Sequence, residues 1–288
     1  MIISASRRTD IPAWHSDWFM ERIREGSFLR VNPFNQKQSS VVTLAPERVD
    51  AICFWSKNPR PLLPHLDELD DRGFRYYFQF TLNPYDSRFE PHLPPLPQRI
   101  DTFHRLADRI GNRRVIWRYD PVILSSATPI SWHIQQMGWL AESLSGKSRR
   151  MVISFCDFTG GLGRRFRSQC ARHGIVVHDL AAPDSSGERE AFCRQAASMA
   201  ALVGVEIVSC GEGVDLSSFG ITAGRCIDPV LIGELVGRDL NLRKDRSQRK
   251  WCGCVQSVDM GVYGTCRHGC IYCYAERGGP HRHWSLTP

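Results

Sequence analysis

The stretch "RYYFQFT", residues 75–81, is a run of aromatic residues interrupted by a single glutamine. A strand with one buried face alternates apolar and polar residues, whereas a strand covered on both faces is apolar almost throughout. Similar runs recur along the chain, and a polar loop and a segment with helical spacing follow most of them. They lie at residues 2–6, 51–55, 114–119, 151–155, 174–178 and 205–209. This alternation predicts an α/β fold with a mainly parallel sheet.

Helices are expected between these strands. They lie at residues 12–24, 60–71, 97–110, 130–144, 162–173 and 188–202. Residues 28–44 interrupt the pattern and predict an inserted β-hairpin. Six or seven βα units can form a doubly wound sheet or a partial or complete TIM-like barrel. We expect the barrel, because polar residues follow most of the strands and can converge on one mouth.

The composition changes near residue 210, where glycine and cysteine become more frequent. We therefore expect residues 1–209 to form the barrel domain. Residues 210–288 are expected to form a cysteine-rich segment with one short helix at residues 229–236. The whole chain has 288 residues, of which 42% are apolar and 23% charged, values typical of a globular protein.

The location of the protein is expected to be cytoplasmic, with no membrane partner. No run of roughly 18 uncharged apolar residues is present, and the N-terminal "MIISASRRTD" reaches charged residues too early for a signal peptide. The formal net charge of +7 permits an anionic partner such as nucleic acid. However, no block of consecutive basic residues concentrates this charge.

Eleven cysteines are many for a compartment that keeps thiols reduced, and they indicate metal ligands or catalysis more than disulfides. Three of them, Cys266, Cys270 and Cys273, are spaced C-x3-C-x2-C. Three thiolates this close can each bind a different iron of a cubane cluster and leave the fourth iron open. A structural zinc site is the alternative. We favour the cluster, because zinc takes four ligands that usually come in two pairs.

Four further cysteines precede this triad. Four thiolates can saturate a second 4Fe-4S cluster or hold zinc in a tetrahedron, and we favour the cluster. These four are Cys210, Cys226, Cys252 and Cys254. The remaining cysteines lie in or beside predicted strands and helices, where a free cysteine behaves as a small apolar residue. They are Cys53, Cys156, Cys170 and Cys193.

The string "CRHGCIYC", residues 266–273, resembles the signature of the radical S-adenosylmethionine (SAM) superfamily. The longer string "YGTCRHGCIYCYAER", residues 263–277, is especially similar to the cluster loop of its spore photoproduct lyase-like members. Together with "FWSKNP", residues 54–59, and the C-terminal position of the triad, it makes the chain resemble a bacterial domain-of-unknown-function family classed as radical-SAM-like. The chain departs from ordinary members, because its cluster loop is C-terminal and it has no Gly-Gly-Glu motif.

The resemblance implies that Cys266, Cys270 and Cys273 bind a 4Fe-4S cluster with an open iron, and that Tyr272 contacts the adenine of SAM. It also implies a reductant such as flavodoxin or ferredoxin. Reductive cleavage of SAM would then give a 5′-deoxyadenosyl radical that attacks a small-molecule or nucleic-acid substrate. The C-terminal segment would cross the barrel mouth to deliver the cluster.

A site for SAM needs a cation for its carboxylate and acceptors for its ribose hydroxyls. Lys57 and Arg118, at the ends of two predicted strands, are the candidate cations. Asp120 and Glu212 are the candidate acceptors. For each of the two cations the alternative is a solvated or paired surface residue.

The first predicted strand ends in "SRRTD", residues 6–10. Arginine binds carboxylate and phosphate through its planar fork, so Arg7 and Arg8, with Asp10, are candidates for contact with an anionic substrate. An ion pair between Arg8 and Asp10 is the structural alternative.

The sequence thus predicts a radical-SAM-like enzyme of unknown substrate. Two other classes stay open. One is a nucleic-acid-binding or repair-associated iron-sulfur protein, and the other is a zinc-stapled protein without catalysis.

Overall fold

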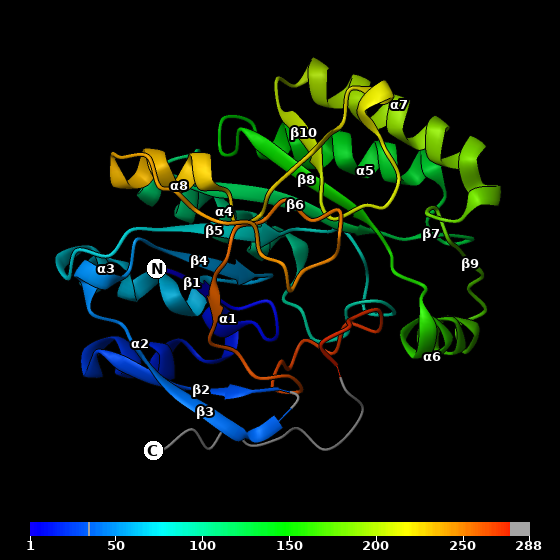
Figure 1. The fold of residues 1–288 in the computed structure, drawn as a ribbon. Coiled ribbons are helices and arrows are strands. Elements are labelled where there is room, and N and C mark those ends of the chain that lie inside the picture. The colour runs from blue at the N-terminus through cyan, green and yellow to red at the C-terminus, as the bar shows by residue number, and fades with distance from the viewer. Residues whose placement is uncertain (34, 277–288) are drawn as a thin grey trace.

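The computed structural model describes residues 1–33 and 35–276 (Figure 1). Its centre is an eight-stranded sheet in the order β11-β10-β8-β6-β5-β4-β1-β12, and every pair of neighbouring strands is parallel. The strands are β1 (Ile2–Ala5), β4 (Ala51–Ser56), β5 (Tyr76–Thr81), β6 (Val115–Val122), β8 (Arg150–Phe155), β10 (Glu206–Ser209), β11 (Thr222–Ala223) and β12 (Val258–Asp259). The predicted strands are confirmed in this sheet, with the exception of residues 174–178.

The sheet winds in one direction. From β1 to β11, each strand is added on the same side of the one that precedes it in the chain. A doubly wound sheet would reverse direction at a switch point. Winding in one direction with right-handed crossovers puts the connecting helices on one face, as in a TIM-like barrel. The α/β class is therefore confirmed, and the strand order is that of a TIM-like barrel.

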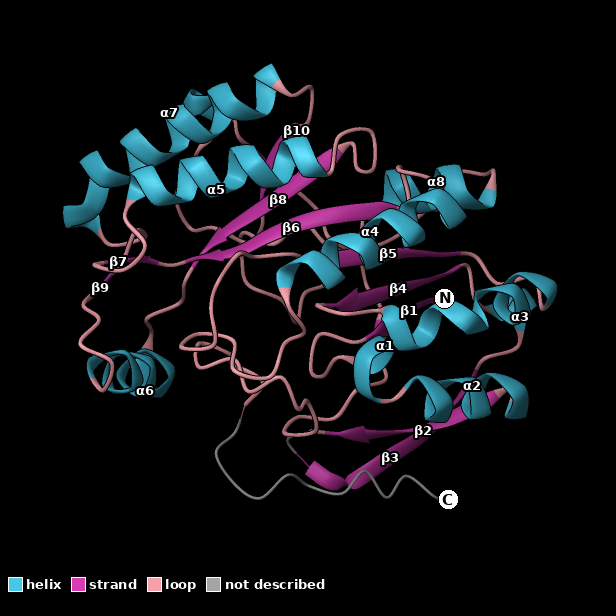
Figure 2. Cartoon of the chain, turned by 180° about the vertical axis from the view of Figure 1, so that it is seen from behind, coloured by secondary structure: helices cyan, strands magenta, loops and turns pink. Residues whose placement is uncertain are grey.

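Most of the helices cover the outer face of this sheet (Figure 2), whereas α6 (Gly160–Ala171) packs beside residues 270–273. The longest are α4 (Leu96–Ile110), α5 (Ile130–Ser143), α6 (Gly160–Ala171) and α7 (Ser186–Leu202). The helix predicted at residues 12–24 is divided into α1 (Ile11–Trp14) and α2 (Ser16–Glu25), because the backbone of His15 leaves the helical region. The helix predicted at residues 60–71 starts as the 3-10 helix Arg60–His65, which contains Pro64, and continues as α3 (Leu66–Asp71).

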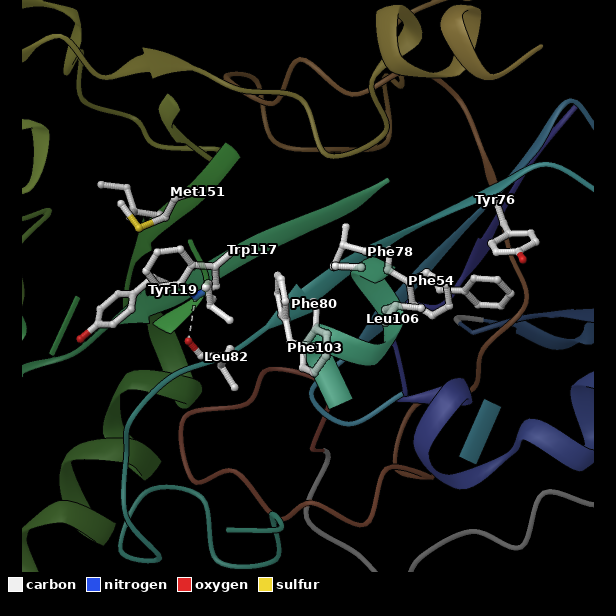
Figure 3. Close-up of a cluster of buried hydrophobic side chains, with 14 of the residues drawn as sticks. Phe54, Tyr76, Phe78, Phe80, Leu82, Phe103, Leu106, Trp117, Tyr119 and Met151 are labelled. Atoms are coloured by element: carbon white, nitrogen blue, oxygen red, sulfur yellow. Dashed lines mark hydrogen bonds between the residues drawn. The ribbon is translucent and has the colours of Figure 1, made fainter. Parts of the chain in front are cut away.

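The largest apolar core lies between the outer face and the helices (Figure 3). Phe54 of β4 stacks on Phe78 of β5 with ring centroids 4.8 Å apart, and Phe80 lies 5.0 Å from Phe103 of α4. These side chains are fully buried. The alternate residues of β5 point to the concave face, where Tyr77 packs in a second apolar cluster. Burial on both faces explains why β5 has no polar face.

The C-terminal part of the chain fills the concave face. Cys226, Ile227 and Ile232 pack there against residues of β1, β4 and β5, and Ile232 belongs to α8 (Pro229–Val236), a helix at its predicted position. The same part supplies β11 and β12, the two edge strands of the sheet. The chain after residue 210 is thus part of the sheet and of its concave packing.

The strand predicted at residues 174–178 is wrong as a member of the main sheet. Of these residues only two form a strand, β9 (Val177–His178). It pairs antiparallel with β7 (Leu124–Ser125) in a separate sheet. Val176 is 62% exposed between the buried Ile175 and Val177, so this run has one buried face only.

The predicted hairpin is confirmed as β2 (Ser27–Asn32) and β3 (Asn35–Thr43). No helix among the described residues combines the length and the apolar character needed to cross a membrane.

Candidate functional site

The loop of residues 264–276 lies at the carboxyl ends of the strands, between α1 and α6 in Figure 1. Nε2 of His15, beside α1, donates to the carbonyl of Thr265 (3.2 Å), and Arg165 of α6 donates to the carbonyl of Cys273 (2.6 Å). The amide of Ile271 donates to the carbonyl of Phe89, beyond β5 (3.1 Å). The far C-terminal loop is therefore attached where the parallel strands end.

Cys266, Cys270 and Cys273 of this loop are free thiols, and Cys270 is buried. Burial raises the pKa of all three, that of Cys266 to about 12, and the charges of the other thiolates of the loop raise the pKa of Cys270 further. The opposing charge of Lys57 lowers the pKa of Cys270 in part. A bound cation would remove this penalty, because metal ligation deprotonates thiols.

The described residues of this loop do not surround a single metal ion. Within residues 1–33 and 35–276, no three His, Cys, Asp or Glu side chains are grouped so that they could hold one metal ion. The cysteines of a cubane each bind a different iron and do not have to meet at one point. The positive φ of Gly264 (+76°) and of Gly269 (+67°) lets the backbone turn sharply around the thiols.

A buried charge network attaches Tyr272 of this loop to the barrel. Nζ of Lys57 lies 2.7 Å from Oε1 of Glu90 and 2.9 Å from the hydroxyl of Tyr272, which in turn donates to Glu90. Nη1 of Arg99 lies 3.8 Å from the other oxygen of Glu90, whose side chain is 0% exposed. Burial would raise the pKa of Glu90, but the charges of Lys57 and Arg99 lower it below its usual value. Lys57 is at the mouth as predicted, and it is paired with Glu90, a residue that the sequence did not single out.

Asp10 joins three parts of the mouth. One of its oxygens accepts from the amide of Ala13 (3.0 Å) and caps α1, while the other accepts from the amide of Lys57 (2.8 Å) and from Nε2 of His268 (2.8 Å). Burial would raise the pKa of Asp10, but the hydrogen bond and charge of His268 lower it. Both oxygens are thus occupied by donors of the protein. The ion pair between Arg8 and Asp10 does not form, since Arg8 lies 3.9 Å from Asp259 instead.

Arg118 is paired as well. Its Nε lies 2.9 Å from Asp120, and its Nη1 lies 3.2 Å from Gln79 and 2.8 Å from the sulfur of Cys226. Asp120 also accepts from the hydroxyl of Ser154. Both predicted residues therefore lie at the strand ends on the concave side, bound to each other.

Glu212 follows β10 and accepts from the amide of Phe155 (2.9 Å). Burial raises the pKa of Glu212 to about 7, since the neighbouring charges of Cys210 and Asp120 add to the effect. With Ser209, Gly211 and Trp251 it lines a pocket of about 260 Å³. A carboxyl group that is partly protonated near neutral pH can either donate or accept a hydrogen bond there.

The side chains of Arg7 and Arg8 contact different partners, although the two residues are adjacent in sequence. The guanidinium groups of Arg7 and Arg118 lie 5.3 and 5.2 Å from the indole centroid of Trp55. Nη2 of Arg7 and Nε1 of Trp55 are buried without a hydrogen-bond partner. Arg8 instead donates to the carbonyl of Gly261 (3.3 Å) and lies over the ring of Tyr263.

The four upstream cysteines meet on the concave face. The sulfurs of Cys210 and Cys226 are 3.0 Å apart, and Cys254 accepts from the amide of Ile227 (3.3 Å). The thiols of Cys226 and Cys252 both donate toward the sulfur of Cys254 and lower its pKa. The hydrogen bond from Cys226 lowers the pKa of Cys210 to about 7. The thiols of Cys53, Cys156, Cys170 and Cys193 are buried, as predicted.

The fold and these side chains define an α/β protein of TIM-like topology with two groups of free thiols, one at the strand ends and one on the concave face. Residues 2–275 match the domain of unknown function DUF1848, and the chain belongs to this family. The expected domain-of-unknown-function family is thereby confirmed, and no radical SAM family matches. A search of curated proteins found no match.

Proposed function

We propose that this protein is an iron-sulfur enzyme of the radical SAM type, with a 4Fe-4S cluster on Cys266, Cys270 and Cys273. The observation that carries the proposal is the position of the loop. Its three free thiols are held at the carboxyl ends of the strands of a TIM-like sheet, where barrel enzymes keep their reactive groups. Catalytic groups are recognised by their place in space and not by their order in the chain.

When bound, the cluster and SAM would supply a one-electron reduction that splits the sulfonium, followed by abstraction of a hydrogen atom from the substrate. The reductant would be a protein such as flavodoxin or ferredoxin.

The chain's own residues would hold this loop and exclude water from it. Asp10 binds His268 of the loop, and Glu90 binds the hydroxyl of Tyr272, so both ends of the cysteine motif are attached to the barrel. The charge of Lys57 favours the thiolate of Cys270. Lys57 is also the candidate cation closest to the loop and remains our candidate for the carboxylate of SAM, which would then share it with Glu90.

Glu212 is our candidate for a ribose hydroxyl, since its carboxyl group lines a pocket near the strand ends. Asp120 is already bound by Arg118 and Ser154, which leaves it less capacity to accept a further hydrogen bond.

The test is anaerobic purification followed by iron, sulfide and zinc analysis and an assay for release of 5′-deoxyadenosine from SAM with a reductant. We expect iron and sulfide, release of 5′-deoxyadenosine, and loss of release in Cys270→Ser. Cys193→Ala, which removes a thiol buried in α7, is the matched control and should retain both. Iron without release of 5′-deoxyadenosine would contradict the enzyme, and zinc without iron would contradict the cluster.

A further inference from the structure

The four upstream thiols come from three separate parts of the chain. Cys210 follows β10, Cys226 precedes α8, and Cys252 and Cys254 lie in the loop before β12. All four pack in or against one apolar cluster on the concave face, and the sulfurs of Cys210 and Cys226 are in contact at 3.0 Å. Gathering four thiols in this way requires the long-range folding of the segment and does not follow from local chain geometry.

One buried guanidinium group, that of Arg118, contacts these thiols, and that of Arg7 lies over the same indole ring of Trp55. Nη1 of Arg118 lies 2.8 Å from the sulfur of Cys226. Arg7 has no carboxylate at ion-pair distance within the described ranges, and its Nη2 has no hydrogen-bond partner. A buried cation without an anionic partner is strongly unfavourable. Burial would lower the pKa of Arg7, but negative charge on Cys254, Cys226 and Asp259 raises it.

We propose that Cys210, Cys226, Cys252 and Cys254 form a second metal-thiolate site, whose negative charge is balanced by Arg7 and Arg118. The metal is thiophilic, either a 4Fe-4S cluster or zinc. Four thiolates around Zn²⁺, or around a 4Fe-4S core in its 2+ state, leave a net charge of about −2. Arg7 balances part of this charge. Arg118, which also pairs with Asp120, balances a further part.

Metal binding would require the thiols to separate. The described side chains are not grouped around a single ion as they stand. With a zinc-sulfur distance of about 2.3 Å, sulfurs at the corners of a tetrahedron are about 3.8 Å apart, compared with the 3.0 Å between Cys210 and Cys226. In this proposal Arg7 and Arg118 balance the charge of the thiolates, so they do not bind the substrate or the carboxylate of SAM.

The test removes the terminal triad first. A full-length Cys266→Ala/Cys270→Ala/Cys273→Ala variant, purified anaerobically, should still contain about four iron and four sulfide, or about one zinc, per chain. X-ray absorption should show sulfur ligands. Adding Cys226→Ala and Cys254→Ala should remove this metal, whereas adding Cys170→Ala and Cys193→Ala should not. A folded triad variant without metal, or metal that survives loss of Cys226 and Cys254, would overturn the proposal.

If the triad variant does not fold, the wild-type chain replaces it. Cys226→Ala/Cys254→Ala should then lower the iron content by about half or remove all zinc, and unchanged metal content would overturn the proposal. Arg7→Gln should weaken metal retention against a chelator by about 10–100-fold, while Arg8→Gln, the adjacent residue paired with Asp259, should not. These measurements need no SAM, so their failure is distinct from failure of the proposed enzyme.

Discussion

The ammonium nitrogen of Lys57 lies 2.9 Å from the hydroxyl oxygen of Tyr272, although 215 positions separate the two residues in the chain. Both bind the same oxygen of the buried Glu90. The end of β4, the loop after β5 and the cysteine loop therefore meet in one desolvated charge network. Such networks are costly to break, because the remaining charge stays buried.

Replacing Lys57 with methionine should destabilise the protein by about 3–5 kcal/mol, because Glu90 would keep only Arg99, 3.8 Å away, as a countercharge. Urea denaturation measures the free energy of unfolding. Lys147→Met is the control, since its partner Asp108 is 64% exposed and such pairs contribute less than about 1 kcal/mol. Equal losses in the two variants would show that the network around Glu90 is not desolvated.

Glu212→Gln should change how stability depends on pH. The pKa of Glu212 is raised to about 7 in the folded chain by burial, so the folded chain keeps a proton that the unfolded chain releases above about pH 4.3. The free energy of unfolding should therefore fall as the pH rises from about 4.3 to about 7. The variant lacks this loss and should be more stable than the wild type by about 1–3 kcal/mol at pH 8. Urea denaturation at pH 4 and pH 8 measures the free energy of unfolding of both proteins. A difference in this free energy between variant and wild type that is the same at both pH values would refute the prediction.

Gly269→Ala should weaken the cysteine loop. Gly269 has φ +67°, and an added Cβ would lie 3.0 Å from Cδ2 of His92. We expect a loss of about 1–2 kcal/mol in urea denaturation, together with a lower iron content. Gly187→Ala in α7 is the matched control, because its added Cβ meets nothing within 4 Å and alanine favours helices. If Gly269→Ala behaves like Gly187→Ala, the backbone conformation of the loop does not matter for its stability.

Asp10→Asn should loosen the same loop from the other side. An amide cannot accept from the N–H groups of Ala13, Lys57 and His268 as the carboxylate does, so we expect a loss of about 1–3 kcal/mol. Because the pKa of Asp10 is lowered in the folded chain, its contribution is present above about pH 3.9 and disappears as the pH falls below that value. Hydrogen exchange of residues 264–276 should be faster in Asp10→Asn and unchanged in the exposed Asp101→Asn. Unchanged exchange in both would mean that Asp10 does not hold the loop.

Much of the fold was predictable, because a strand that is buried on both faces consists of consecutive apolar residues. Runs such as residues 51–55 and 75–81 have no polar face, and they identify the central strands. The edge strands β11 and β12 have two residues each and carry no such pattern. Their pairing depends on where the C-terminal part of the chain packs.

The candidate site divides in the same way. The spacing of Cys266, Cys270 and Cys273 is local, so the sequence alone predicts that these thiols act together. The partners of Lys57 and Arg118 are not local, and Glu90 lies in a proline-rich loop without any motif. A charge pairs with whatever the folded chain brings within a few ångströms, and no pattern of neighbouring residues specifies that partner.

Residue order was thus enough to establish the parallel α/β sheet, the hairpin and the terminal cysteine triad, since each depends on periodicity or spacing over a few residues. Folding in three dimensions established which carboxylates neutralise the cations at the mouth and that Cys210, Cys226, Cys252 and Cys254 meet on the concave face. Those contacts join segments far apart in the chain, and they form because buried charges and thiols must find partners inside the protein.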